Sequence, residues 1–162
     1  DNAWAGTITL GTQVATTSGT SIDFTSIPAG IKRITINLVG VSSNGSSVIC
    51  VQIGDSGGVE ASGYTAAGTT AANSSIAAQT ASFPISQNNS ASAVYHGSYT
   101  LNLENSSAFT WIWSGQSIRS EGPHWIQGCG SKSLSAELDR VRLTTVGGSD
   151  TFDAGVVNIS YE

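Results

Sequence analysis

The chain contains 162 residues, enough for one ordinary domain, and only 10% of them are charged, against roughly 25% in an average soluble protein. Lys and Arg together number 6 and Met is absent, which argues against a bundle of long surface helices. The net charge of -5 and the scattered cations exclude the basic patch typical of a nucleic-acid binder. No apolar run approaches the ~20 residues of a membrane-spanning helix, so we expect no membrane insertion.

Short runs of β-branched residues alternate with Gly, Ser and Asn turns along the chain, which is typical of an all-β protein. The runs predict strands at 6–10, 20–25, 31–41, 47–54, 93–103, 109–118, 123–130, 138–146 and 155–161. In the run 31–41, apolar Ile34, Ile36 and Leu38 alternate with polar residues, as in a half-buried strand. The pattern predicts a single domain, an antiparallel β-sandwich with jelly-roll-like connections. Because the chain begins at Asp1 and has no Met, we expect a processed chain or part of a longer one.

Two segments have weaker patterns. Asn44-Gly45 lies between two predicted strands and predicts a tight hairpin, because both residues tolerate positive φ, although the surrounding Ser residues suggest a loop longer than two residues. The segment Gly54–Ser92 is rich in Ala, Ser, Thr and Gly, and it predicts irregular strands and long loops. Binding residues often lie on such loops.

The two cysteines, Cys50 and Cys129, permit either one disulfide or two thiols. Each lies in an apolar strand-like run, where free Cys behaves as a small hydrophobe. We therefore expect both to be free and buried.

Four aromatic or charged residues gather near the turn between the predicted strands 109–118 and 123–130: Arg119, Glu121, His124 and Trp125. A sugar presents CH faces and hydroxyl groups, so its binder offers an aromatic ring beside polar side chains. Arg119 offers a planar donor fork and Glu121 two acceptors. We expect the ligand at this turn, with the Gly54–Ser92 loops as a possible second wall.

Trp111 and Trp113 are two residues apart on one strand, so their side chains face the same way. Phe109 shares this face, whereas Thr110, Ile112, Ser114 and Gln116 share the other. An aromatic face opposite a mostly polar one favours core or subunit interface. A ligand platform made of these two indoles is the alternative.

Catalytic and metal motifs are weak. The two His residues and the absence of a Gly-x-Ser-x-Gly elbow disfavour a hydrolytic triad, and Glu104, Glu121 and Asp153 are the candidate glycosidase acids. We expect no enzyme activity and no cofactor. A structural Ca²⁺ would be sought first at Asp55, Asp150 and Asp153.

Two segments resemble bacteriophage tail fibre and tailspike proteins. The stretch 19–45 contains GTSIDFTSIPAGIKRITI and then LVGVSSNG, and the stretch 138–162 reads LDRVRLTTVGGSDTFDAGVVNISYE. The resemblance implies the C-terminal module of a homotrimeric fibre or spike in the virion tail, folded in the host cytoplasm. Its implied role is receptor binding to bacterial surface polysaccharide or lipopolysaccharide.

Three functions follow from these observations. The first is a non-enzymatic trimeric module that binds a host surface glycan. The second is a structural module that only trimerises and stabilises a fibre tip. The third, more weakly supported, is a small polysaccharide hydrolase.

Overall fold

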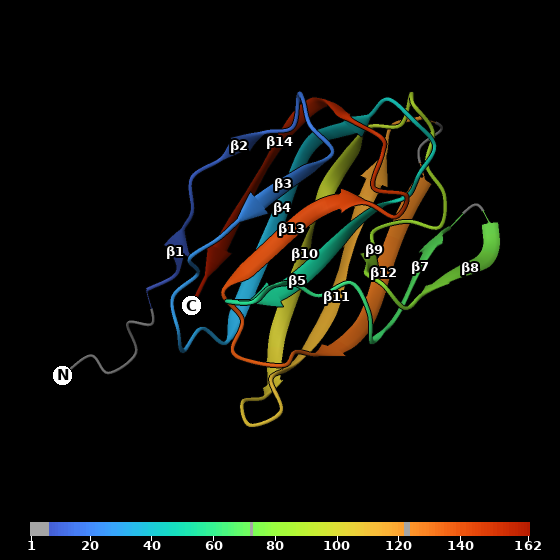
Figure 1. The fold of residues 1–162 in the computed structure, drawn as a ribbon. Helices are drawn as coiled ribbons and strands as arrows, with labels where there is room; N and C mark the ends of the chain where they lie inside the picture. The colour runs from blue at the N-terminus through green and yellow to red at the C-terminus, as the bar shows by residue number, and fades with distance from the viewer. Residues whose placement is uncertain (1–6, 72, 122–123) are drawn as a thin grey trace.

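In a computed structural model, which describes residues 7–71, 73–121 and 124–162, the chain forms two antiparallel sheets packed face to face (Figure 1). The predicted all-β sandwich is confirmed, and no helix occurs in the part of the chain that the structure describes. No helix long and apolar enough to cross a membrane is therefore found among these residues. The described residues surround one continuous hydrophobic core.

The large sheet has nine strands in the order β1-β14-β4-β10-β11-β12-β7-β8, with β2 also paired to β14. Their bounds are β1 Thr9–Leu10, β2 Val14–Ala15, β4 Arg33–Ser43, β7 Tyr64–Thr70, β8 Asn73–Gln79, β10 Tyr95–Asn105, β11 Thr110–Arg119, β12 His124–Ser133 and β14 Phe152–Tyr161. Figure 1 shows β1 and β14 at one edge of this sheet and β7 and β8 at the other.

The small sheet has five strands in the order β3-β13-β5-β6, with β9 also paired to β5. Their bounds are β3 Ser21–Phe24, β5 Ile49–Asp55, β6 Gly58–Val59, β9 Phe83–Pro84 and β13 Arg140–Thr145. In Figure 1 this sheet lies in front of β4, β10 and β11. The strands β10, β11 and β12 follow one another as a meander within the large sheet, so the alternation between sheets expected of a jelly roll is not confirmed.

Every predicted strand coincides with a strand of the structure, although residues 6 and 123, at the start of two predictions, lie outside the described residues. The prediction for Gly54–Ser92 was wrong in one respect. This segment contains β7 and β8, two regular strands of seven residues each, which extend the large sheet beyond β12.

The tight hairpin predicted at Asn44-Gly45 is also wrong. β4 belongs to the large sheet and β5 to the small one, so the chain crosses between sheets here instead of pairing with itself. Asn44 instead pairs with Thr151: its N–H donates to the Thr151 carbonyl, and its Oδ1 accepts from the Thr151 N–H, each over 2.9 Å. The Asn-Gly turn therefore forms a corner of the sandwich.

Alternation along each strand builds the core. Large apolar and aromatic side chains of the large sheet face the small sheet, and almost all of the largest are fully buried. The main contributors are Ile34, Ile36, Leu38, Tyr95, Tyr99, Leu101, Trp111 and Trp113, opposite Ile49, Val51, Ile53, Val141 and Leu143. The intervening residues of the large sheet form its outer face, which the second sheet does not cover.

Candidate functional site

The predicted hairpin around residue 120 is present, since β11 pairs with β12 in antiparallel register. Ile118 pairs with Trp125 and Arg119 with His124. Because neighbouring residues on a strand point to opposite faces, Trp125 lies on the outer face of the large sheet and Arg119 on the inner face. The structure therefore does not join the predicted ligand residues into one cluster, because the side chains of Arg119 and Trp125 lie on opposite faces of the sheet.

Arg119 holds together one end of the sandwich. Its side chain is only 11% exposed, and its two terminal nitrogens donate to Glu121 Oε2 over 2.7 Å and to Asn88 Oδ1 over 2.9 Å. The Ser90 hydroxyl also donates to Glu121. Hydrogen bonds from Ser90 above all, and then from Ser92 and Arg119, hold the pKa of the Glu121 carboxyl below its ordinary value. The donor fork of Arg119 is thus engaged by the protein itself.

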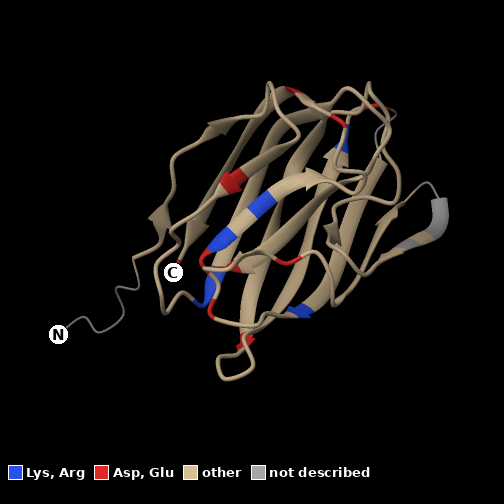
Figure 2. Cartoon of the chain, in the orientation of Figure 1, with Lys and Arg blue, Asp and Glu red and all other residues tan. Residues whose placement is uncertain are grey.

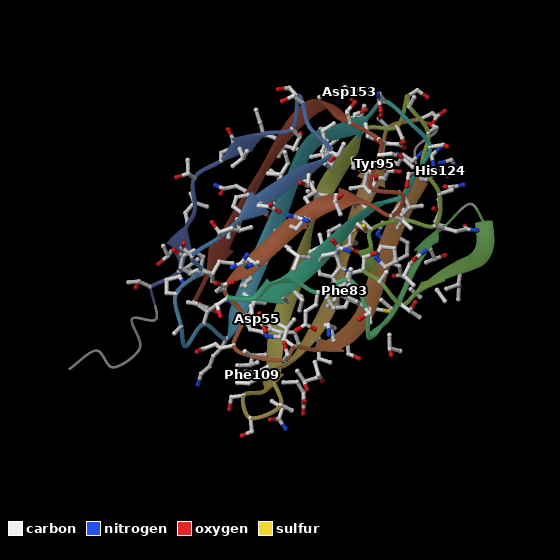
Figure 3. The ribbon with its side chains drawn as sticks, in the orientation of Figure 1. Asp55, Phe83, Tyr95, Phe109, His124 and Asp153 are labelled. Carbon is white, nitrogen blue, oxygen red and sulfur yellow. The ribbon has the colours of Figure 1, made fainter. Side chains whose placement is uncertain are left out.

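Two further residues belong to this end (Figure 3). The Tyr95 hydroxyl donates to Asn89 Oδ1 over 3.0 Å, and burial raises the pKa of Tyr95. His124 is half-buried, and its Nδ1 has no hydrogen-bond partner among the described residues. The arrangement ties the segment 86–90 to the β11–β12 hairpin.

The indoles of Trp111 and Trp113 lie in the core, so the alternative of a ligand platform made of them is wrong. Trp111 is 2% exposed and Trp113 is fully buried. Trp113 is stacked between Tyr99 and Phe83, with ring centroids 4.8 Å and 5.3 Å away. Figure 3 shows Phe83 in the middle of the sandwich. The aromatic face of β11 therefore packs in the hydrophobic core.

Trp125 is the exposed indole of the hairpin. Its side chain lies on the outer face of β12, and the residue is 52% exposed. The indole N–H donates to Oε1 of Gln116 on the neighbouring strand over 3.1 Å. This contact fixes the orientation of the ring against the sheet while leaving much of its surface open.

A groove of about 630 Å³ lies beside Trp125 on the outer face of the large sheet. It crosses five neighbouring strands, from β10 through β11, β12 and β7 to β8. Its lining combines hydroxyl and amide groups with a somewhat larger apolar surface, to which exposed Ile76 contributes. The lining residues are Ala67, Gly68, Thr69, Ile76, Ser98, Thr100, Ser114, Gly115, Gln116, Gln127, Gly128 and Cys129. The Gly54–Ser92 segment, expected as a second wall, contributes β7 and β8 to this groove. Its residues Asn88 and Ser90 also contact Arg119 and Glu121 at the end of the sandwich.

Three glycines form the floor of the groove in one row across the sheet: Gly115 pairs with Gly128, and Gly128 with Gly68. On the inner side of the sheet, a Cβ on Gly128 would lie 2.5 Å from the Pro84 carbonyl oxygen, and one on Gly68 would lie 2.7 Å from the Ser86 oxygen. Glycine therefore lets the segment around β9 pack directly on the backbone of the sheet.

An apolar row borders the groove. Val39, His96, Ile118 and Trp125 pair in sequence across β4, β10, β11 and β12, and we call them the cross-strand row. The exposed fractions of its apolar members are 55% for Val39, 49% for Ile118 and 52% for Trp125. The groove thus has a glycine floor, polar side chains along it and an apolar border on one side.

Charged side chains lie elsewhere. All six cations of the sequence lie outside the groove, and no carboxylate belongs to its described lining. Five cations form ion pairs, namely Arg33–Glu162, Arg119–Glu121, Lys132–Glu60, Arg140–Asp139 and Arg142–Asp23. Figure 2 shows the charges on β13 and β3 and near strand ends, while the middle of β10, β11 and β12 is uncharged.

The cysteines form no disulfide, as predicted, but only one of them is buried. Burial raises the pKa of the Cys50 thiol to about 11, against a smaller lowering by the Ser82 hydrogen bond. Cys129 is exposed and lines the groove, so the prediction of a buried thiol is wrong there. Its position follows from strand alternation, because its neighbours Gly128 and Gly130 take the inward positions of β12.

The acidic residues named for Ca²⁺ do not come together. Asp55 accepts hydrogen bonds from the Gly57 N–H and the Ser135 hydroxyl, whereas Asp150 accepts from the Ser47 N–H. Figure 3 shows Asp55 and Asp153 far apart, toward opposite ends. Among the described residues, no three His, Cys, Asp or Glu side chains are grouped as a metal site would require.

Comparisons of the chain with protein-family models, with curated proteins and with solved structures give no match. The groove was missed from the sequence, because β7 and β8 were not recognised as strands. The polar alternation of β10 and β11, with Ser98, Thr100, Ser114 and Gln116 on one face, was the available signal.

Proposed function

We propose that this chain is a non-enzymatic carbohydrate-binding module of a phage tail fibre or tailspike, and that the groove on the outer face of the large sheet holds the glycan. The observation that carries the proposal is the groove itself, which sets neutral hydroxyl and amide groups beside an exposed, oriented indole. The resemblance of residues 19–45 and 138–162 to such fibre proteins supports the setting.

The chemistry of the groove suits a sugar. Gln116 and Gln127 each offer amide donors and an acceptor, and the hydroxyls of Ser98, Thr100 and Ser114 both donate and accept. Sugar hydroxyls need both kinds of partner. A pyranose stacked on Trp125 would gain about 1 kcal/mol beyond its buried area.

Binding is favoured over hydrolysis by the composition of the groove. A glycosidase places two carboxyl groups on either side of the scissile bond, roughly 5–10 Å apart. The described lining of the groove consists of Ala, Gly, Thr, Ile, Ser, Gln and Cys residues. These side chains hold a ligand and supply no acid for bond cleavage.

We also propose that three copies assemble, because the fibre proteins that residues 19–45 and 138–162 resemble are trimeric and the outer face carries exposed apolar side chains beyond the lining of the groove. Val39 and Ile118 of the cross-strand row are about half exposed, and Ile112 is 38% exposed. Exposed apolar side chains gathered on one face are typical of an interaction surface. Three weak sites on one particle would gain avidity from simultaneous contact with a cell surface.

Binding of the purified chain to arrayed bacterial polysaccharides and lipopolysaccharides tests the carbohydrate proposal. We expect Gln127→Ala and Trp125→Ala each to weaken binding about fivefold, the loss of roughly 1 kcal/mol. Asn102→Ala is the matched control, since Asn102 is an exposed polar residue of the same face outside the groove. Absence of binding to every glycan, or equal binding by all three variants and the parent, would contradict the proposal.

A further inference from the structure

The rows of side chains on the outer face run across the strands. Ser98, Gln116 and Gln127 pair in sequence across β10, β11 and β12, and so do Thr100, Ser114 and Cys129. The cross-strand row lies parallel to them, one step further along each strand. A ligand laid along one of these polar rows, with Trp125 beside it, therefore lies perpendicular to the strands, in the direction in which the groove crosses from β10 to β8.

The length of the groove sets the size of such a ligand. From β10 to β8 there are four strand intervals, which gives a span of about 19 Å at the usual separation of neighbouring strands. This span exceeds one sugar ring and suits a short run of linked sugars. Because the groove crosses these strands and reaches the edge of the sheet at β8, a polymer can continue beyond it and be bound through an internal segment.

The charge distribution restricts the chemistry further. An acidic glycan needs a cation, or several backbone donors aimed at one point, to replace the water lost by its carboxylate or phosphate. The cations on the strands that form the groove are already paired: Arg119 of β11 is on the inner face with Glu121, and Lys132 of β12 is buried with Glu60. Neutral hydroxyls lose far less on leaving water, and the groove offers them matching partners.

Resting on the proposed function, we infer that the groove binds an internal segment of a neutral polysaccharide, laid across the strands from β10 to β8. The polar rows hydrogen-bond the hydroxyl edges of the sugars. Trp125 at the border packs against an apolar sugar face. Acidic polysaccharides are excluded, since the described lining of the groove holds no cation for their charge.

Cys129 provides a direct test of the location. It is the exposed thiol of the groove, whereas Cys50 is buried, so a maleimide reagent labels Cys129 selectively in the folded chain. Binding is measured to neutral polysaccharides (dextran, mannan and galactan) and to acidic ones (alginate and polysialic acid). Labelled protein is compared with Cys129→Ser treated with the same reagent.

We expect binding to at least one neutral polymer on the order of tenfold tighter than to any acidic one, with less than about a twofold change between about 20 mM and about 500 mM salt. Treatment with maleimide abolishes this binding in the parent. The same treatment does not change the binding of Cys129→Ser, which has no reactive thiol in the groove. Affinity rises with oligosaccharide length until the ligand spans the groove and then levels off.

The remaining outcomes separate the two proposals. Tight, salt-sensitive binding of an acidic polymer that the label blocks overturns the neutral ligand and leaves the carbohydrate module standing. Binding that the label does not affect overturns the groove as the site. Binding to none of the five polymers counts against this inference, while the array of bacterial glycans still decides the proposed function. Ser114→Lys gives a second criterion, because it strengthens binding only if the ligand is acidic.

Discussion

Trp113 stacks on Tyr99 across β10 and β11, with ring centroids 4.8 Å apart and ring planes 7° from parallel. On its other side Trp113 meets Phe83 of β9, which belongs to the opposite sheet. This indole therefore joins the two layers of the sandwich behind the floor of the groove. The indole of Trp125, on the outer face, does not pack between the two sheets.

We predict that Trp113→Ala lowers the free energy of unfolding by about 3–5 kcal/mol, because it empties a large buried site. Trp125→Ala should change it by less than about 1 kcal/mol, since the side chain is half exposed. Denaturant unfolding of both variants checks this. Similar losses in the two variants would mean that Trp125 is also a packing residue.

Gly128→Ala should destabilise the fold by about 1–3 kcal/mol, since the added methyl group would lie 2.5 Å from the Pro84 carbonyl oxygen. Cys129→Ala, at the adjacent residue on the outer face, is the control and should melt near the parent temperature. Thermal melts followed by circular dichroism give the comparison. A parent-like Gly128→Ala would refute direct packing of β9 on the sheet.

The two thiols should differ in reactivity. Cys129 is exposed, whereas Cys50 is buried with a pKa raised to about 11. At neutral pH we expect one thiol per folded chain to react with iodoacetamide and the second only in denaturant. Intact-mass spectrometry counts the adducts. A non-reduced mass about two units below that of the reduced chain would show a disulfide instead.

Stability should fall in acid partly through Glu60. Burial alone would raise its pKa, but hydrogen bonds from Lys132 and Ser135 outweigh this and hold the pKa below its ordinary value of 4.5. A depressed carboxyl pKa contributes stability above the unfolded-state value, and this contribution is lost as the pH falls through the folded-state value. Glu60→Gln should cost about 1–3 kcal/mol at pH 7, because it leaves buried Lys132 without its counter-ion.

The pH dependence separates this ion pair from general acid unfolding. Unfolding free energies of parent and Glu60→Gln, measured from pH 7 to pH 3, should converge toward the acid end. Glu104→Gln serves as the control, since Glu104 is exposed and its substitution should leave the curve unchanged. A difference in unfolding free energy between parent and Glu60→Gln that stays constant from pH 7 to pH 3 would exclude the proposed role of the carboxylate.

The trimer is tested by multi-angle light scattering at micromolar concentration, where we expect three times the chain mass. Ile118→Lys and Val39→Lys should shift the mass toward that of a single chain, because each puts charge into the exposed apolar surface. Arg142→Lys on the small sheet should leave it unchanged. A single-chain mass for the parent would contradict the assembly.

Strand alternation made much of the fold predictable. A spacing of two residues between large apolar side chains indicates directly which side of a strand is buried. Both examples hold: Ile34, Ile36 and Leu38 are buried, and so are Trp111 and Trp113. The strands β7 and β8 were missed because Ala, Gly and Ser have low intrinsic β-propensity, and pairing with β12 holds them in place. Local sequence gives no signal for such pairing.

The candidate site was predictable only in part. Trp125 was found, but Arg119 was grouped with it because the two lie near one turn. Parity would have separated them, since Arg119 shares the face of Trp111 and Trp113. The Asn44-Gly45 hairpin failed for a related reason: a turn sequence specifies local backbone geometry and not which sheet the next strand joins.

The pairing of β1 with β14 brings Thr9 opposite Tyr161, although almost the whole sequence separates them. β14 lies between β1 and β4. Because β14 follows all the other described strands in the sequence, the edge of β4 stays unpaired during synthesis until β14 has been made. Non-local pairing of this kind slows folding, and an open edge recruits other chains in the meantime. A chain that stopped before Phe152 would leave the edge of β4 permanently unpaired. We expect such a chain to aggregate rather than to fold as a shortened sandwich.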